Sequence, residues 1–196
     1  MNFLAHIFLS GNETGVLIGN FIGDFVKGND YLKYPEDVRR GILLHRKIDA
    51  FTDKHAVTKF CKTFIKPKYK KYSGIVVDIF YDHFLAINWE QYSSVPLRDF
   101  VIQKYNILNK HHSFFPEEIK KFFPYFHKSN WLYAYSTLEG LRLVLRGMAY
   151  RTSIPDFSYY AITRLKDNYE VLENNFTVFF KDILEFVKAE FSIQPG

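Results

Sequence analysis

Ionisable side chains recur inside otherwise apolar, helix-patterned segments of the first 83 residues, and this distribution constrains the fold more than any other feature of the chain. Burying so many ionisable groups is costly unless they are paired or coordinate a metal ion. The segments must therefore either expose these groups or bring them together, and the spacing favours the second arrangement. Carboxylate and imidazole ligands together suit Mn²⁺, Mg²⁺ or Fe²⁺, whereas thiolates are typical of structural zinc sites. The residues concerned are His6, Asp24, His45, Asp49, Asp53, Asp78, Asp82 and His83.

Helical periodicity runs along the chain, and no alternation of period two persists anywhere. We therefore expect an all-α fold, a helical bundle in a single domain over residues 1–196. The segment SGIVVDIFYDHFLAINW begins with β-branched residues that also suit a strand near residues 72–80, but its length favours a helix over 72–89. Further helices are expected at residues 13–26, 35–51 and 156–191, near Leu97, after Pro116, and after the capping-box pattern from Ser136 to Glu139.

The ionisable residues are spaced so that several of them share helix faces. His45 and Asp49 lie four residues apart in GILLHRKIDAFTD, and Asp78 and Asp82 are related in the same way. Asp24 lies in GNFIGDFVKG, where glycines allow a bend or a close approach of the backbone. Such pairs also occur on helices for stability alone, but inward-facing groups from several helices commonly build metal sites in bundles. The residues alone leave a metal-dependent hydrolase and a structural explanation in balance.

The single cysteine, Cys61, cannot form an internal disulfide, which is typical of a reducing compartment. The N-terminal segment MNFLAHIFLSGN lacks the basic region of a secretory signal. No apolar run approaches the length of about 18 residues that a membrane span needs. We therefore expect a cytoplasmic protein.

The formal net charge of +5 is partly local, because lysines crowd the segment around Pro67. A solvated basic turn is the usual role of such a run. The functional alternative is a docking patch for an acidic partner, either a nucleic acid or an acidic protein. The lysines are Lys59, Lys62, Lys66, Lys68, Lys70 and Lys71.

The strings MNFLAHIFLS, GNFIGDFVKG, GILLHRKIDAFTDKH and YSGIVVDIFYDHFLAINW closely resemble the acyl carrier protein phosphodiesterase family. The resemblance covers residues 1–90 at the level of motifs and continues more loosely to Thr152 through GLRLVLRGMAYRT. Members of this family look like distant relatives of the all-helical HD-domain phosphohydrolases, which use His and Asp ligands. This chain has no His-Asp dipeptide and carries the reverse order in Asp82 and His83, so the HD ligand set is not transferred to it.

The resemblance implies hydrolysis of the phosphodiester between 4′-phosphopantetheine and a serine of holo-acyl carrier protein. It also implies Mn²⁺ as the ion, with Mg²⁺ and Fe²⁺ as alternatives. An ion held by the chain would activate water and polarise a phosphoryl oxygen. The expected metal ligands are Asp24, His45, Asp49 and Asp78.

Other residues are expected to assist the same reaction. His83 would protonate the departing serine oxygen, and Arg46 or Arg151 would neutralise phosphoryl charge with forked guanidinium donors. The remaining ionisable residues would either bind the metal themselves or orient its ligands. These are His6, Asp82 and Asp53.

Carrier proteins of this kind are strongly acidic, so a chain with a pI near 9.1 complements them. We expect docking through Lys62, Lys66, Lys68, Lys70 and Lys71, and no nucleic acid or membrane partner. Two alternatives stay open. An HD-like phosphohydrolase acting on a nucleotide would use the same cluster without the lysines. A helical nucleic-acid-binding protein without enzymatic activity would use the lysines and leave Asp78 unexplained.

Overall fold

The amphipathic segments fold as helices in the computed structural model, which describes residues 1–195. Within that range no residue lies in a β-strand, so the all-α prediction is confirmed, and residues 73–80 are helical rather than extended. The helices are α1 (Phe3–Leu9), α2 (Thr14–Ile22), α3 (Glu36–Lys54), α4 (Ala56–Tyr69), α5 (Ser73–Ile87), α6 (Leu97–Lys110), α7 (Glu117–Lys128), α8 (Trp131–Ala134), α9 (Leu138–Arg151), α10 (Ser158–Asp167) and α11 (Tyr169–Phe191). Short 3₁₀ helices are η1 (Gly23–Phe25), η2 (Asp30–Lys33), η3 (Lys70–Tyr72), η4 (Trp89–Gln91) and η5 (His112–Phe114).

Local sequence signals explain most helix boundaries. Pro35, Pro96 and Pro116 each occupy the N-cap position of α3, α6 and α7, where the missing N–H of proline is tolerated. The capping box was predicted one residue too early. Thr137, not Ser136, caps α9, because its hydroxyl accepts a hydrogen bond from the backbone N–H of Gly140 at 3.0 Å.

Two predicted helices are divided in the structure. The pattern over 156–191 is interrupted at Asn168, whose side-chain amide donates to the carbonyl oxygen of Arg164 and so competes with the helical hydrogen bonds. The pattern over 13–26 ends as an α-helix at Ile22 and continues as the tighter turn η1. This change of winding lies directly before Asp24.

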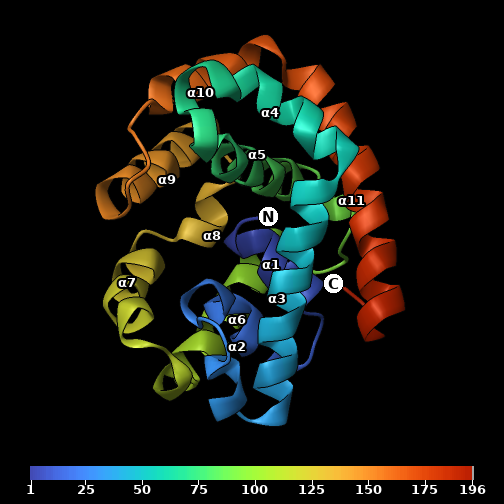
Figure 1. The fold of residues 1–196 in the computed structure, drawn as a ribbon, viewed down its shortest axis with the longest axis vertical. Helices are drawn as coiled ribbons and strands as arrows, with labels where there is room; N and C mark the ends of the chain where they lie inside the picture. The colour runs from blue at the N-terminus through green and yellow to red at the C-terminus, as the bar shows by residue number, and fades with distance from the viewer. Residues whose placement is uncertain (196) are drawn as a thin grey trace.

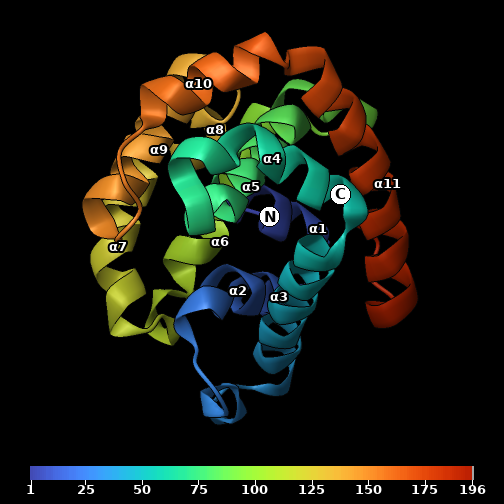
Figure 2. The same ribbon diagram turned by 45° about the horizontal axis from the view of Figure 1, so that its top comes forward.

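The helices surround α1, which lies near the middle of the molecule in both ribbon views (Figures 1 and 2). Its residues from Leu4 to Leu9 are all buried. α2 packs closely on α3, because a Cβ atom at Gly19 would lie 2.0 Å from the carbonyl oxygen of Val38. α11 follows the outer edge of the bundle on the side away from α7 (Figure 1). The first three helices therefore bring the N-terminal motifs together at the centre of the fold.

Phenylalanine and tyrosine fill much of the interior. Phe3, for example, has its ring centroid 4.9 Å from that of Phe126 and 5.7 Å from that of Phe21, at the offset angles that aromatic pairs prefer. These rings pack in the core between α1, α2 and α7. In the part of the chain that the structure describes, no helix has the length and apolar character that crossing a membrane requires.

Candidate metal centre

Three elements bring histidine and aspartate side chains into contact. α1 contributes His6, η1 contributes Asp24, and α3 contributes His45 and Asp49; we call these four residues the His/Asp cluster. His45 Nε2 lies 3.2 Å from Asp24 Oδ1 and 3.2 Å from Asp49 Oδ2. His6 Nε2 lies 3.2 Å from Asp49 Oδ1, and the two imidazole rings stack with centroids 4.0 Å apart. The structure thus brings together the spaced pair of α3 and the aspartate of the glycine-rich turn.

The close approach of η1 to α3 depends on Gly23. A Cβ atom at this position would lie 2.3 Å from Cγ of His45, a distance that real Cβ contacts do not show. The glycine therefore allows Asp24, the next residue, to reach the imidazole. This is the role that the sequence predicted for the glycines around Asp24.

Asn20 orients both imidazole rings, and the sequence analysis did not select it. His6 Nδ1 donates a hydrogen bond to Asn20 Oδ1 at 2.8 Å, and His45 Nδ1 donates to the backbone carbonyl oxygen of Asn20 at 2.7 Å. The Asn20 amide is fixed in turn, because its Nδ2 donates to the His6 carbonyl oxygen and to Ser10 Oγ. Both Nε2 atoms are left facing Asp49. Metal-binding histidines commonly donate their second ring N–H in this way.

Asp78 lies beside the cluster and contacts it through an amine. Its Oδ1 is 3.0 Å from the amino group of Met1, and the same amino group is 3.9 Å from Asp49 Oδ1. Burial alone would lower the pKa of this amine, but the carboxylates of Asp78 and Asp49 outweigh burial and raise it. Burial raises the pKa of the Asp78 carboxyl, and the amine opposes that rise. The two carboxylates therefore share a cationic neighbour.

Charge inside the cluster is tightly coupled. Burial alone would lower the pKa of the His45 imidazole, but the carboxylates of Asp24 and Asp49 raise it to about 9. Burial alone would raise the pKa of the Asp49 carboxyl, whereas the two histidines hold it well below its usual range. Burial, together with the charge of His45, lowers the pKa of His6. In the absence of an ion, a proton on His45 therefore offsets the repulsion between the carboxylates, and a bound cation would displace it.

The chemistry of the donor atoms fits a divalent ion. One ligand atom from each of His6, His45 and Asp49 lies within 4.8 Å of the others. His45 Nε2 is buried and, although two carboxylates are close, it makes no hydrogen bond. A buried polar atom without a hydrogen bond is costly, and a metal ion that displaces the proton of His45 would bind the lone pair of Nε2. Nitrogen and oxygen donors without thiolate suit Mn²⁺, Fe²⁺ or Mg²⁺.

Asp82 was expected to bind the metal or to orient its ligands, but in the structure it binds the backbone at the start of α1. Its carboxylate accepts hydrogen bonds from the backbone N–H groups of Asn2 (3.1 Å), Leu4 (2.7 Å) and Ala5 (3.4 Å), so it caps the first turn of α1. Burial raises the pKa of the Asp82 carboxyl to about 7, against the effect of the nearby amine and these N–H groups. Asp82 therefore holds the helix that carries His6, and its oxygens do not face the cluster.

The structure also separates His83, Arg46 and Asp53 from the cluster, contrary to the expectation from sequence. His83 Nδ1 donates to the carbonyl oxygen of Tyr135 at 2.7 Å, and its Nε2 accepts from the hydroxyl of Tyr169 at 3.0 Å. One residue along a helix turns the side chain by about 100°, so His83 faces away from the side shared by Asp78 and Asp82.

Arg46 and Asp53 serve local contacts. Arg46 donates to the carbonyl oxygens of Val26 and Gly28, both at 2.9 Å, and therefore holds the loop that follows Asp24. Asp53 is exposed and forms an ion pair with Lys62 at 2.7 Å. The guanidinium of Arg46 and the carboxylate of Asp53 are therefore engaged in these contacts, whereas the sequence analysis expected them to bind the substrate phosphate and the metal site.

A cavity of about 610 Å³ opens beside the His/Asp cluster, and we call it the cluster cavity. Its lining includes His6, Asp24 and His45 from the cluster, together with Arg151 from the end of α9. Arg151 therefore lies where the sequence analysis expected a phosphate-binding cation. α7 adds Lys121, which was not predicted, because no local motif links it to the N-terminal residues.

We call the predicted docking lysines the lysine segment; they are Lys62, Lys66, Lys68, Lys70 and Lys71, and none of them lines the cluster cavity itself. A Cβ atom at Gly74 would lie 3.2 Å from Cε of Lys62, so the lysine packs against the start of α5. The next residue, Ile75, lines the cluster cavity. Lys62 is thus joined to the cavity wall through the first turn of α5.

Comparisons with known proteins agree with this geometry. The family model described as acyl carrier protein phosphodiesterase matches residues 1–183. A protein of Yersinia pestis named acyl carrier protein phosphodiesterase is 33% identical over 188 residues, covering 94% of this chain and 96% of the relative. Proteins of the same name from Enterobacter sp. (34% over 181 residues, 92% and 94% coverage) and Serratia proteamaculans (30% over 189 residues, 96% and 98%) are also similar. No solved structure matches the chain, so the relation to HD-domain proteins stays a prediction.

Proposed function

The chain belongs to the acyl carrier protein phosphodiesterase family, and we propose that it hydrolyses the phosphodiester joining 4′-phosphopantetheine to a serine of holo-acyl carrier protein. The products are apo-acyl carrier protein and free 4′-phosphopantetheine. The observation that carries this proposal in the structure is the His/Asp cluster, whose two Nε2 atoms and Asp49 carboxylate converge at the wall of a cavity. A phosphodiester carries one negative charge, which Arg151 and Lys121 can complement in a lining that also holds Asp24 and Glu118.

We propose Mn²⁺ as the ion of the cluster, with Mg²⁺ and Fe²⁺ as alternatives. His6, His45 and Asp49 would hold it, with Asp24 beside His45 as a further oxygen donor. When bound, the ion supplies a Lewis acid that activates water and polarises the phosphoryl group. Asn20 keeps both imidazoles in the tautomer that leaves Nε2 free to bind.

Cationic side chains in the lining of the cluster cavity would bind the substrate phosphate. Arg151 and Lys121 both line the cluster cavity. A guanidinium binds phosphoryl oxygens through paired N–H donors, and an ammonium acts as a point charge. Together they offset the charge that builds up on the phosphoryl group and on the departing serine oxygen. His83 takes no part in this step, because both of its ring nitrogens are engaged by Tyr135 and Tyr169.

The lysine segment would dock the acidic carrier protein. Its exposed members follow the last turns of α4 and η3, close to the start of α5 that lines the cluster cavity. A carrier bound there would bring its serine near the cavity mouth. We propose that this reaction occurs in the cytoplasm, because the single, buried Cys61 suits a reducing compartment.

The test is to incubate metal-loaded protein with holo-acyl carrier protein and to measure the mass of the carrier. We expect loss of the prosthetic group and appearance of 4′-phosphopantetheine, with Mn²⁺ giving higher turnover than a chelator-treated sample. Asp53→Ala is a matched control for Asp49→Ala, because both replace an aspartate of α3 but only Asp49 contacts the histidines. Hydrolysis of nucleotides with no action on holo-carrier would instead favour the nucleotide phosphohydrolase.

A further inference from the structure

Asn2 lines the cluster cavity, and the reaction proposed above gives it no role. It occupies the N-cap position of α1, where its carbonyl oxygen accepts a hydrogen bond from the backbone N–H of His6 at 3.1 Å. Residues four apart along a helix share a face, so the Asn2 side chain precedes that of His6 by one turn, about 5.4 Å. A phosphoryl group bound beside His6 is therefore within reach of the Asn2 amide.

The oxygen end of this amide is fixed by two hydrogen bonds. Asn2 Oδ1 accepts from the backbone N–H of Phe3 at 2.9 Å and from the hydroxyl of Tyr135 at 2.7 Å. The Tyr135 side chain is fully buried, so its hydroxyl relies on Asn2 as its partner. Both donors meet the same atom of the amide, which must therefore be the acceptor oxygen. The plane of the amide is held in one orientation as a result.

The nitrogen end of the amide is free. Asn2 Nδ2 forms no hydrogen bond with the residues that the structure describes, and it is not among their buried atoms that lack a partner. It is therefore open to the space that Asn2 lines, which is the cluster cavity. The backbone N–H groups of Leu4 and Ala5 are already bound by Asp82. The Asn2 side chain is thus the donor that this end of α1 presents, and an amide nitrogen can bind only an acceptor.

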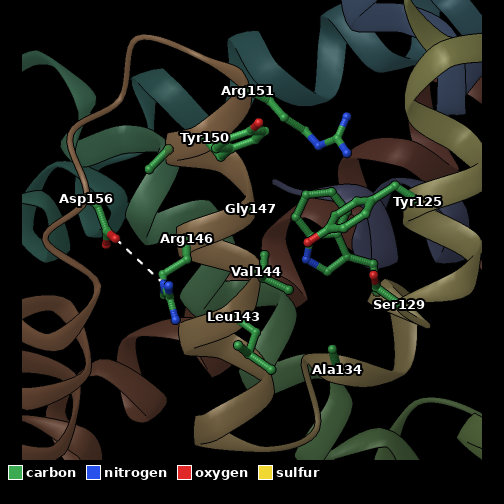
Figure 3. Close-up of a pocket in the computed structure, with 12 residues that line it drawn as sticks. Tyr125, Ser129, Ala134, Leu143, Val144, Arg146, Gly147, Tyr150, Arg151 and Asp156 are labelled. Carbon is green, nitrogen blue, oxygen red and sulfur yellow. Dashed lines mark ion pairs between the residues drawn. The ribbon is translucent and has the colours of Figure 1, made fainter.

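The other donors of the cavity lining are long, exposed side chains, Arg151 and Lys121. In Figure 3 Arg151 extends toward Tyr125, whose ring centroid lies 4.2 Å from the guanidinium, and away from Asp156. Ordering such side chains around a ligand costs rotamer entropy, whereas the Asn2 amide is already held in place. A donor fixed in this way stabilises charge that develops in a transition state without having to reorganise.

We propose that Asn2 is a catalytic residue, whose Nδ2 donates a hydrogen bond to a non-bridging phosphoryl oxygen of the scissile phosphodiester. This inference rests on the proposed function, because the phosphodiester must lie in the cluster cavity. The bond strengthens as negative charge gathers on the phosphoryl oxygens during attack by water. A hydrogen bond to a charged group contributes about 10- to 100-fold to an equilibrium or rate. Inorganic phosphate presents the same oxygens, so the amide also binds this ion.

Two substitutions remove the donor and keep the helix cap, Asn2→Asp and Asn2→Ser, because Asn, Asp and Ser are about equally good N-cap residues. Asn2→Asp retains an acceptor for the hydroxyl of Tyr135, and Asn2→Ser adds no charge. Calorimetric titration of the Mn²⁺-loaded protein with inorganic phosphate measures the donor without turnover. We expect both variants to bind phosphate at least about tenfold more weakly and to lose at least about tenfold in kcat/KM for holo-carrier.

Two controls separate this role from a structural one. Asn174→Asp makes the same chemical change at an exposed position of α11 outside the cavity lining, and should leave phosphate affinity unchanged. The Mn²⁺ affinity of both Asn2 variants should stay within about threefold of wild type, because a displaced α1 would disturb His6 and weaken it by more.

Several results would overturn the proposal: no binding of phosphate by the wild-type protein, unchanged phosphate affinity in Asn2→Ser, or a loss confined to Asn2→Asp, which would be an effect of charge. A fall in Mn²⁺ affinity equal to the fall in phosphate affinity would also overturn it. Failure of the wild-type protein to hydrolyse holo-carrier would instead contradict the proposed function. The phosphate titration would still report on the amide in that case.

Discussion

Asn20 gives the sharpest single-residue test of how the cluster is built. Asn20→Ala removes the acceptor of His6 Nδ1 at 2.8 Å, but it keeps the backbone carbonyl oxygen that orients His45 at 2.7 Å. Only one of the two imidazoles is therefore released. Loss of a group that orients a metal ligand costs about 10–100-fold in metal affinity. This corresponds to about 1.4–2.7 kcal/mol of binding free energy.

The same substitution also affects folding, and its cost follows from the contacts. The Asn20 side chain makes buried hydrogen bonds of 2.8, 2.7 and 2.9 Å, to the His6 ring, the His6 carbonyl oxygen and Ser10 Oγ. At about 1 kcal/mol for each bond, the free energy of unfolding falls by about 3 kcal/mol. The variant is thus expected to fold, which circular dichroism and a thermal melt check before the metal is added.

Calorimetric titration with Mn²⁺ measures the affinity, and turnover of holo-carrier against Mn²⁺ concentration provides a second readout. Ser10→Ala is the matched control, because it removes a partner of the Asn20 amide at 2.9 Å without touching either ring. We expect it to reduce stability and to change the Mn²⁺ affinity by no more than about threefold, below the range for a lost orienting group. An unchanged affinity in folded Asn20→Ala, or an equal loss in Ser10→Ala, would refute the reasoning.

Three further predictions follow from the structure. Replacing the lysine segment except Lys62 by glutamate should raise KM for holo-carrier with little change in kcat, and the effect should shrink as salt rises; unchanged kinetics at low salt would exclude docking there. Asp53→Ala should retain turnover within about threefold, whereas Asp49→Ala should lose at least about 100-fold in side-by-side assays, and equal losses would contradict the assignment. Burial lowers the pKa of His83. Below about pH 6.5 the imidazole is therefore protonated in the unfolded chain but remains neutral in the folded protein. Stability should therefore decrease as the pH falls through that window, by up to about 1.4 kcal/mol per pH unit, and urea titrations of His83→Gln should show a smaller decrease.

Local periodicity predicted the all-helical fold, several of the longer helices and the pair at the centre of the cluster. It did not predict α4, because the lysines around Pro67 suggested a basic turn where the structure has a helix. His45 and Asp49 share a face because of their spacing, whatever surrounds α3. The helical form of residues 73–80 followed from length, despite the β-branched side chains. The division at Asn168 was missed because a single polar residue in an amphipathic pattern gives no clear signal of a break.

The direction of the polar side chains on α5 needed the tertiary structure. Asp78 and Asp82 do share a face, but that face meets the start of α1, so Asp82 caps a helix. His83 follows Asp82 and is turned by about 100°, which sequence spacing alone should have shown. Asn20 was missed because the sequence analysis looked for metal ligands, and an amide is a weak one. Its role is to accept hydrogen bonds from the two histidines.

No sequence motif predicted that side chains of α7 and α9 line the cluster cavity. Arg151 was selected from the sequence because its guanidinium can bind phosphate. Lys121 reaches the cluster cavity because α7 packs against α1 and α9, although it is more than a hundred residues away from Met1 in the sequence. No periodicity relates such segments. Their meeting depends on how the whole core packs.

Anomalous X-ray scattering from crystals soaked in Mn²⁺ tests the central claim most directly. The account predicts a manganese peak within bonding distance, about 2.0–2.3 Å, of His6 Nε2, His45 Nε2 and an Asp49 oxygen. The peak should be absent from crystals of His45→Ala. No peak at the cluster in the wild-type protein, or a peak bound only by residues outside it, would contradict the account.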